Sequence, residues 1–422
     1  MTESILHYVW RFRLFQKDLK TTDGKEIEII DVGIPNTNEG PDFFNAKIKI
    51  EGKVWAGNIE IHHSSNEWKQ HNHHTNKNYN SVILHVVKNA NCDVLNEQQQ
   101  PITQCEITYP KYVDENYEFL IQSNTSIPCR NFIGTLPSIH LNSWISNLLF
   151  ERLERKANHI YDLLSRFNNS WEDVFYVLLS RNFGFGLNSD SFERLALSLP
   201  LKYIQKQGDN IVQIEALLFG QAGMLTDCNK RDEYFDLLQK EYDFLCNKYT
   251  LQPLDTLLFK KLRTRPTSLP EIRVAQLAAL LHSSQGLFSK IISCEDPGRI
   301  RLMFHINASE YWQTHYTFGM ASEKKSKYLG DTSLDVILIN TVAPILFAYG
   351  KKTDNEMLCE RAIKFLETLA PEKNTITRDF SKMMVPLRNA ADSQAIIQLK
   401  REYCELRKCL FCRVGHQFLT VQ

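Results

Sequence analysis

The stretch NAKIKIEGKVWAGNIEIH, at residues 45–62, contains two runs in which apolar and polar side chains alternate. A period of two residues is typical of β-strands that are buried on one face. Glu51 and Gly52 separate the two runs, and a short connection that contains glycine favours a tight turn. The stretch therefore predicts an antiparallel β-hairpin.

Further β-rich runs and amphipathic helices surround this hairpin. They are the runs 25–33, 81–87 and 102–110 and the helices 3–17 and 66–79. From about residue 138 onward, apolar residues recur at spacings of three and four, which indicates helices. We predict an α+β protein with an α/β domain at 1–125 and a larger all-α region at 138–422, and an extended linker at about 111–137.

The composition excludes several classes of protein. The 422 residues include 49 Lys and Arg against 49 Asp and Glu, and 43% are hydrophobic. A disordered tail, a collagen-like fibre and a highly charged nucleic-acid coat do not have this composition. Because the net charge is zero, bulk charge gives no argument for nucleic acid binding. A neutral protein can still carry a local basic groove.

The chain shows no pattern of a membrane or secreted protein. No apolar run approaches the roughly 20 residues that cross a bilayer. The run at 336–350 contains Asn340 and Pro344 and predicts a buried helix. The N-terminus lacks the basic and then apolar order of a secretion signal. We expect a cytoplasmic protein with no membrane partner.

Most cysteines show no disulfide spacing, and we predict that they are reduced core residues. The isolated ones are Cys92, Cys105, Cys129, Cys228, Cys246, Cys294 and Cys359.

Acidic residues lie at the ends of two predicted neighbouring strands. Asp42 follows Gly-Pro and opens one strand, while Glu60-Ile61-His62 ends the next. Alternation places Glu60 and His62 on one face. Two such carboxylates can hold a divalent metal, Mg²⁺ or Mn²⁺, that keeps waters for a phosphate substrate. The alternative for Asp42 is a turn or cap residue, whereas Glu60 in an apolar run needs a partner or metal.

Residues 3–90 resemble the PD-(D/E)xK nuclease superfamily, whose core is a helix, three strands, a helix and a further strand. Pro41-Asp42 and Glu60-Ile61-His62 match its motif, but His62 stands where the family has lysine. The resemblance implies Asp42 and Glu60 as metal ligands and DNA or RNA as substrate. His62 could then act on the attacking water as general base or charge stabiliser, or Lys47 or Lys49 could supply the missing cation.

Histidines are frequent after the hairpin. They are His62, His63, His71, His73, His74 and His85. His73 and Tyr79 flank the next strand and belong to a polar cluster, for which zinc is the competing ligand. For His71 and His74 we favour a solvated face, and for His85 a hydrogen-bonded core position.

Two features stand out in the helical region. Gly220 and Gly223 interrupt an apolar helix and predict close helix packing. Three arginines, Arg263, Arg265 and Arg273, gather around two prolines. They could contact phosphates, but we favour a structural role, such as capping carbonyls or pairing with acids of the same region.

The C-terminal segment contains a run of metal-ligating residue types, namely Cys404, Cys409, Cys412 and His416. This set could bind zinc or an iron–sulfur cluster. On a continuous helix Cys404 points away from the other three, so a shared site requires a break near Leu406-Arg407. We favour a buried thiol cluster over a metal site.

Segments along the whole chain, among them GPDFFNAKIKIEG, GNIEIHHSSNEWKQHNH and CLFCRVG, resemble a bacterial family of about 420 residues whose function is unknown. The resemblance implies no activity. Our leading hypothesis is a metal-dependent nuclease or DNA-processing protein. The alternatives are a non-catalytic module that binds nucleic acid or protein, and a scaffold held by metal at the C-terminal thiols.

Overall fold

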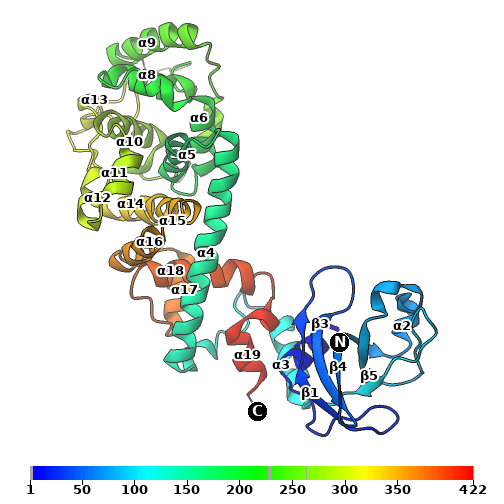
Figure 1. Cartoon of the computed structure of the whole chain (residues 1–422). Helices are drawn as coiled ribbons and strands as arrows, with labels where there is room; N and C mark the ends of the chain where they lie inside the picture. Colours follow the sequence, from blue (N-terminus) through cyan, green and yellow to red (C-terminus); the bar gives the residue numbers. More distant parts are fainter. Residues whose placement is uncertain (1–2, 227–230, 263, 422) are drawn as a thin grey trace. The chain divides into compact units, whose positions relative to one another are not determined.

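The computed structural model describes residues 3–226, 231–262 and 264–421. Cys228 and Arg263 lie outside these ranges. The described chain combines an N-terminal β-sheet with a larger helical region, so the predicted α+β class is confirmed (Figure 1).

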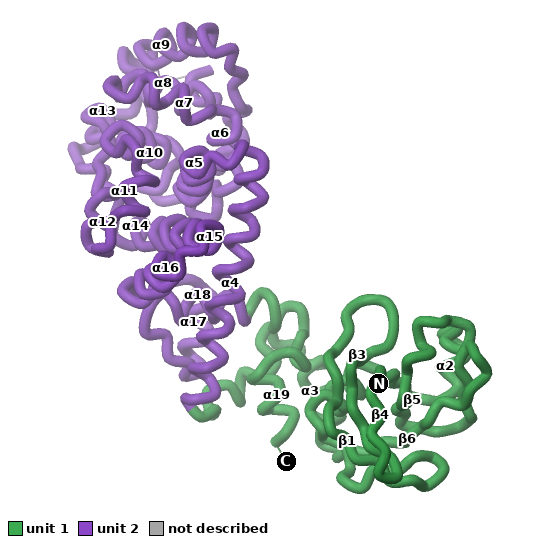
Figure 2. Tube along the Cα trace, in the orientation of Figure 1, with its two compact units in different colours: residues 1–137, 400–422 green, residues 138–399 purple. Residues whose placement is uncertain are grey.

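The chain divides into two compact units (Figure 2). Unit 1 consists of residues 1–137 and 400–422, and unit 2 consists of residues 138–399. The helical periodicity of the sequence predicts a single region over 138–422. Residues 400–422 instead belong to the unit that contains the sheet, where the C-terminal helix contacts the helix at 111–122.

Unit 1 contains a mixed six-stranded sheet. Its strands are β1 (Ile27–Asp31), β2 (Ile34–Pro35), β3 (Phe43–Ile50), β4 (Lys53–Ser64), β5 (Val82–Asn89) and β6 (Gln104–Glu106). The order across the sheet is β1, β3, β4, β5 and β6, and β2 also pairs with β3. The pairs β1–β3, β2–β3 and β3–β4 are antiparallel, while β4–β5 and β5–β6 are parallel.

The predicted hairpin is confirmed. Ile50 pairs with Lys53, and the two residues between them, Glu51 and Gly52, have φ angles of 47° and 82°. Positive φ at both central positions is the geometry of a type I′ turn, whose twist matches that of the flanking strands. The turn thereby sets the register of β3 against β4.

Helix α1 (Glu3–Arg11) packs against β4. It buries Ile5, Leu6 and Val9 on its inner face. The helix is shorter than the predicted 3–17, because Arg13 adopts a left-handed conformation with φ of 52°. An L-residue in that conformation does not continue a right-handed helix.

The single helix predicted at 66–79 is wrong. The segment forms α2 (Glu67–Gln70) and two 3₁₀ helices, η1 (His73–Thr75) and η2 (Lys77–Tyr79). Asn72 lies in the left-handed region with φ of 62°, and the Asn76 side chain accepts a hydrogen bond from the backbone of Asn78. Asparagine favours such local turns over a continuous helix.

The extended linker predicted at 111–137 is also wrong, because it contains helix α3 (Lys111–Gln122) and the 3₁₀ helix η3 (Ile133–Thr135). The C-terminal helix α19 (Arg413–Leu419) packs beside α3. The Asn116 side chain of α3 donates to the carbonyl of Phe418 at 3.2 Å. This contact joins the two segments of chain that make up unit 1.

The regular secondary structure of unit 2 is helical in its described residues, apart from isolated β-bridges between residues 307 and 328. Its α-helices are α4 (Ser138–Arg166), α5 (Trp171–Phe183), α6 (Ser189–Ser198), α7 (Leu201–Gln205), α8 (Ile211–Gln221), α9 (Glu233–Tyr249), α10 (Pro270–Ser283), α11 (Leu287–Ser293), α12 (Pro297–Met303), α13 (Glu310–Gln313), α14 (Asp331–Ile337), α15 (Ala343–Lys352), α16 (Glu356–Thr368), α17 (Thr375–Lys382) and α18 (Ala390–Gln398). The 3₁₀ helices η4 (Thr256–Leu258) and η5 (Pro266–Ser268) lie in its loops.

A continuous apolar helix runs from Asp331 to Lys352 in unit 2. The π-helical turn η6 (Leu338–Val342) joins α14 to α15 just before Pro344, which has no N–H to donate. By length and composition this helix could span a membrane, but 72% of its most apolar window is buried inside the protein. The predicted buried helix at 336–350 is therefore confirmed.

Close helix packing at Gly220 is confirmed as well. A Cβ atom at this position would lie 2.1 Å from the ring of Tyr242 on α9. Only glycine leaves room for α9 at this distance.

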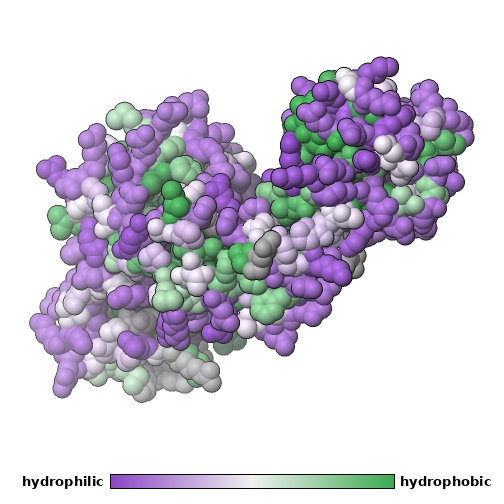
Figure 3. Space-filling model, turned by 90° about the horizontal axis from the view of Figure 1, so that it is seen from below, coloured by the Kyte–Doolittle hydropathy of each residue, from purple (hydrophilic) through white to green (hydrophobic). Residues whose placement is uncertain are grey.

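The molecular face drawn in Figure 3 is mostly hydrophilic, with hydrophobic areas between the polar side chains. The most exposed large hydrophobic residues of the described chain are Leu257, Leu262, Met357, Met384 and Ile139. Single residues of this kind are common on globular proteins, so we assign them no binding role.

Candidate functional site

Asp42 and Glu60 meet where β3 begins beside β4. The pairing of Phe43 with Ile59 places them opposite each other. The backbone N–H of Asp42 donates to Glu60 Oε2 at 3.1 Å, and the N–H of Ile61 donates to Asp42 Oδ2 at 2.9 Å. The structure thus brings together the two carboxylates that the sequence selected.

Glu60 is buried, with only 4% of its surface exposed. Burial raises the pKa of its carboxyl to about 9, and the Asp42 carboxylate adds to this effect. Both causes disfavour the ionised form. A cation placed beside Glu60 would reverse this balance and favour the ionised form.

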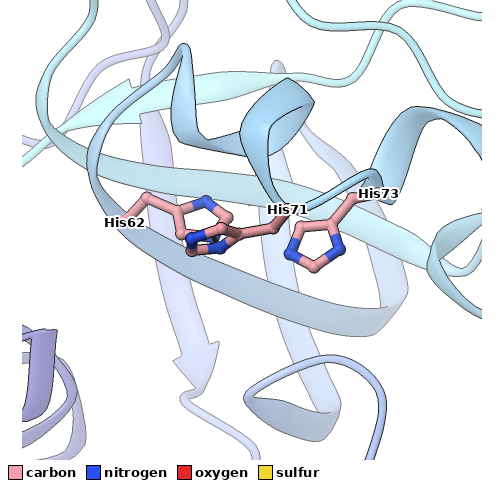
Figure 4. Close-up of side chains that lie close together, drawn as sticks. All are labelled: His62, His71 and His73. Atoms are coloured by element: carbon pink, nitrogen blue, oxygen red, sulfur yellow. Dashed lines mark hydrogen bonds between the residues drawn. The ribbon is translucent and has the colours of Figure 1, made fainter.

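Three histidines lie close together (Figure 4), and two of them lie beside Glu60. His62, His71 and His73 each have a ring nitrogen within 4.8 Å of the others. His73 Nε2 lies 3.1 Å from Glu60 Oε1, and His62 Nε2 lies 3.5 Å from the same oxygen. The cluster therefore combines imidazole and carboxylate donors, which suit transition metals such as zinc and manganese.

A chain of hydrogen bonds sets the tautomer of His62. The Gln104 amide nitrogen donates to the carbonyl of Cys92 at 2.9 Å, so its oxygen faces His85 Nδ1 at 3.2 Å. His85 Nδ1 must then carry the proton, which leaves Nε2 as acceptor for His62 Nδ1–H at 2.9 Å. The remaining nitrogen, His62 Nε2, presents its lone pair toward His71 Nδ1 at 3.1 Å.

Burial keeps both members of this pair neutral. It lowers the pKa of His62 to about 2 and that of His85 to about 4, with neighbouring histidines adding to the effect on His62. A metal-ligating histidine is commonly oriented in this way by a partner on its second nitrogen. The prediction that His85 is a hydrogen-bonded core residue is confirmed.

Aromatic rings hold the cluster in place. The Tyr79 ring stacks on His73, with their centroids 3.8 Å apart. Trp68 packs edge-on against His73, and it is fully buried. Tyr79 therefore joins the predicted polar cluster by packing against His73.

Two members of the site are not those that the sequence favours. His71 is exposed, as predicted, but its Nδ1 contacts His62. His7, on α1, lies with Nε2 3.2 Å from Asp42 Oδ2. Burial acts to lower the pKa of His7, but the Asp42 carboxylate outweighs this effect and raises it. The only sequence signal for His7 as a member of the site is its position on a predicted amphipathic helix.

Lys47 and Lys49 do not join these residues. They pair with Ala56 and Val54 in the hairpin, nearer its turn. Lys47 thus lies four β4 positions from Glu60, which corresponds to about 13 Å along the strand. The ammonium of Lys49 instead pairs with Glu28 at 3.3 Å.

Two of the three arginines that the sequence groups around the prolines, Arg265 and Arg273, lie within the described residues of unit 2. Arg265 is exposed beside η5. Arg273 is buried, donates to Gln276 at 2.9 Å and stacks on the Phe185 ring at 4.0 Å. These contacts agree with the structural role that we favour for Arg273.

His416 lies beside helix α1. Its Nδ1 lies 2.8 Å from the Tyr8 hydroxyl of α1, and its ring packs on Phe12. Cys404, Cys409 and Cys412 are all buried. Of the predicted set, His416 therefore contacts Tyr8 and Phe12, whereas the three cysteines are buried elsewhere in unit 1.

The fold and these residues define an α+β protein with a partly buried cluster of carboxylates and histidines in its sheet unit. The chain belongs to a family described as protein of unknown function (DUF2851), whose model matches residues 3–375. No curated protein and no solved structure matches the chain.

Proposed function

We propose that unit 1 is a metal-dependent phosphodiesterase that acts on nucleic acid. The observation that carries the proposal is the pairing of Asp42 with Glu60 beside the lone pair of His62. The order α1, β1, β3, β4, α2, β5 also agrees with the helix, three strands, helix and strand of the PD-(D/E)xK superfamily, with β2 as a short addition.

The donor set fits a divalent cation. Asp42 and Glu60 would supply oxygen, and His62 would supply nitrogen; the ligand nitrogens of His71 and His73 lie within 4.8 Å of that of His62. This mixture favours Mn²⁺ or Zn²⁺ over Mg²⁺, which prefers oxygen ligands. When bound, such a cation polarises a phosphate and lowers the pKa of a coordinated water.

The side chains divide the remaining tasks. His62 does not replace the positive charge of the family's lysine, because its burial keeps it neutral; it serves as a ligand. His7 takes the lysine's place as the cationic group beside Asp42. Glu60 releases its proton when the cation binds.

Isosteric variants test the proposal. The full chain is assayed with Mn²⁺, Zn²⁺ or Mg²⁺ on single- and double-stranded DNA and RNA. We expect Asp42→Asn and Glu60→Gln each to lower metal-dependent cleavage by at least 100-fold, because each removes a ligand charge. Lys47→Ala is the control, since Lys47 lies outside the cluster.

Cleavage retained in both carboxylate variants would refute the proposal. Nucleic acid binding without cleavage under every metal, and unaffected by chelation, would assign unit 1 to the non-catalytic alternative.

A further inference from the structure

Four cysteines from two distant segments line one small hollow in unit 1. They are Cys129, Cys404, Cys409 and Cys412. All four are buried, with exposed fractions between 7% and 9%. Cys129 is isolated in the sequence, and only the fold places it with the other three.

A break in the C-terminal helix brings the last three cysteines into the same hollow. The π-helix η7 (Leu399–Cys404) is followed by Arg407 in a left-handed conformation with φ of 53°. The 3₁₀ helix η8 (Cys409–Phe411) then begins. This is the break that a shared site requires, because a continuous helix would direct Cys404 away from the other two.

Close packing and hydrogen bonds fix the backbone around the hollow. A Cβ atom at Gly415 would lie 2.1 Å from the carbonyl oxygen of Cys409, so α19 can approach this loop only with glycine there. The Arg407 guanidinium donates to the carbonyl of Ser123 at 2.6 Å, and Lys400 donates to that of Ser126 at 2.9 Å. The C-terminal segment is thereby fastened to the stretch that contains Cys129.

Four buried thiols that line one hollow would ionise together only around a cation. Thiolates are the ligands of zinc and of iron–sulfur clusters, and a bound metal deprotonates them.

We propose that Cys129, Cys404, Cys409 and Cys412 together bind a soft metal centre, either one Zn²⁺ or an iron–sulfur cluster. The centre fastens the C-terminal segment to the sheet unit. This site is separate from the cluster at Asp42 and Glu60 and does not depend on the proposed hydrolysis. In this set of ligands Cys129 takes the place of His416, which the sequence suggests as the fourth member and which contacts Tyr8 instead.

Metal analysis of the full chain, purified without oxygen, tests the proposal. We expect about one zinc per chain with no visible absorption, or iron with equivalent sulfide and a broad band near 400 nm. Either result supports the four-thiolate centre, and the two results distinguish its forms. A protein with less than about 0.1 equivalent of either metal and with four reactive thiols at these positions would refute it.

Single substitutions identify the ligands. Cys129→Ser and Cys409→Ser should each lower the bound metal at least fivefold, whereas His416→Gln and the unit 2 control Cys359→Ser should retain it. Retention of metal in Cys129→Ser together with loss in His416→Gln would overturn the proposed ligand set.

Alkylation of the native wild-type protein provides a readout that needs no variant. Iodoacetamide followed by peptide mass spectrometry should leave the four cysteines unmodified until a chelator or acid removes the metal. Equal labelling before and after metal removal would contradict the proposal.

Discussion

His62 Nδ1 lies 2.9 Å from His85 Nε2, and this contact decides which nitrogen of His62 faces Glu60. The contact is itself set from β6, because Gln104 accepts from the other nitrogen of His85. Three neighbouring parallel strands thus orient one imidazole. When a metal-ligating side chain is already oriented before the metal arrives, less conformational entropy is lost on binding, and the metal is bound more tightly.

Gln104→Leu should weaken metal binding at the Glu60 cluster. The variant removes the acceptor that fixes the His85 tautomer, so His62 Nε2 is no longer held as an acceptor. We expect a 10- to 100-fold loss of affinity for Mn²⁺ or Zn²⁺, as is typical when such a supporting partner is removed. Titration calorimetry on metal-free protein measures it, with the exposed Gln98→Leu as control. Equal affinities of the two variants would show that the chain of hydrogen bonds does not act on the metal.

The stability of the metal-free protein should fall as pH rises from 7 to 9. Burial raises the pKa of Glu60 to about 9, from 4.5, so over this range the folded chain keeps a proton that the unfolded chain has released. Stability falls with pH wherever the folded state binds more protons, by at most about 1.4 kcal/mol per pH unit for one group.

Urea denaturation in EDTA at several pH values measures this slope. His62 and His85 act against this slope only near pH 7, because both are neutral in the folded chain, and the unfolded chain, whose histidines titrate near pH 6.5, loses their protons as the pH rises further. Glu60→Gln should flatten the slope, since a neutral amide takes the place of the protonated carboxyl. A slope that is the same in both proteins would assign the effect to another group, such as His7.

The part of the site that could be predicted from the sequence lies within one hairpin. Alternation places Glu60 and His62 on one face, and the two-residue turn sets β3 against β4 as far as the pair Ala46 and Gly57. The register then shifts by one residue between Ala46 and Phe43, and this shift, which the alternation and the turn do not predict, places Asp42 opposite Glu60.

The remaining members come from segments whose positions depend on packing. His7 reaches Asp42 only because α1 packs on β4, and Cys129 reaches the C-terminal thiols only because α19 returns to α3. Local patterns carry no signal of such long-range pairs. For Lys47 and Lys49, alternation predicts the face of β3 on which they lie. Their pairing with Ala56 and Val54 nevertheless places them too far along the strand to reach Glu60.

Lys49→Ala should leave metal-dependent cleavage within about twofold of wild type. Its ammonium pairs with Glu28 at the surface, and an exposed pair of this kind contributes about 0–1 kcal/mol to stability. His7→Gln should instead lower turnover at least tenfold, because it removes the cationic group beside Asp42. Single-turnover cleavage rates measure both. A large loss in Lys49→Ala with full activity in His7→Gln would return the cationic role to the strand lysine.

Gly220→Ala should destabilise unit 2, although helix propensity alone predicts the opposite. Alanine at a helix interior is favoured over glycine by about 1 kcal/mol. The added methyl would, however, lie 2.1 Å from the Tyr242 ring, which is held by a hydrogen bond from its hydroxyl to Gln221 at 3.1 Å. Overpacking of this kind typically costs about 1–3 kcal/mol.

The double variant separates the two contributions of this change. Without the Tyr242 ring, in the Tyr242→Ala background, the same Gly220→Ala change should become neutral or stabilising by about 1 kcal/mol, because only helix propensity then acts. Urea denaturation of the four proteins measures the coupling. If Gly220→Ala stabilises the otherwise wild-type chain, the close approach of α8 and α9 at this glycine is incorrect.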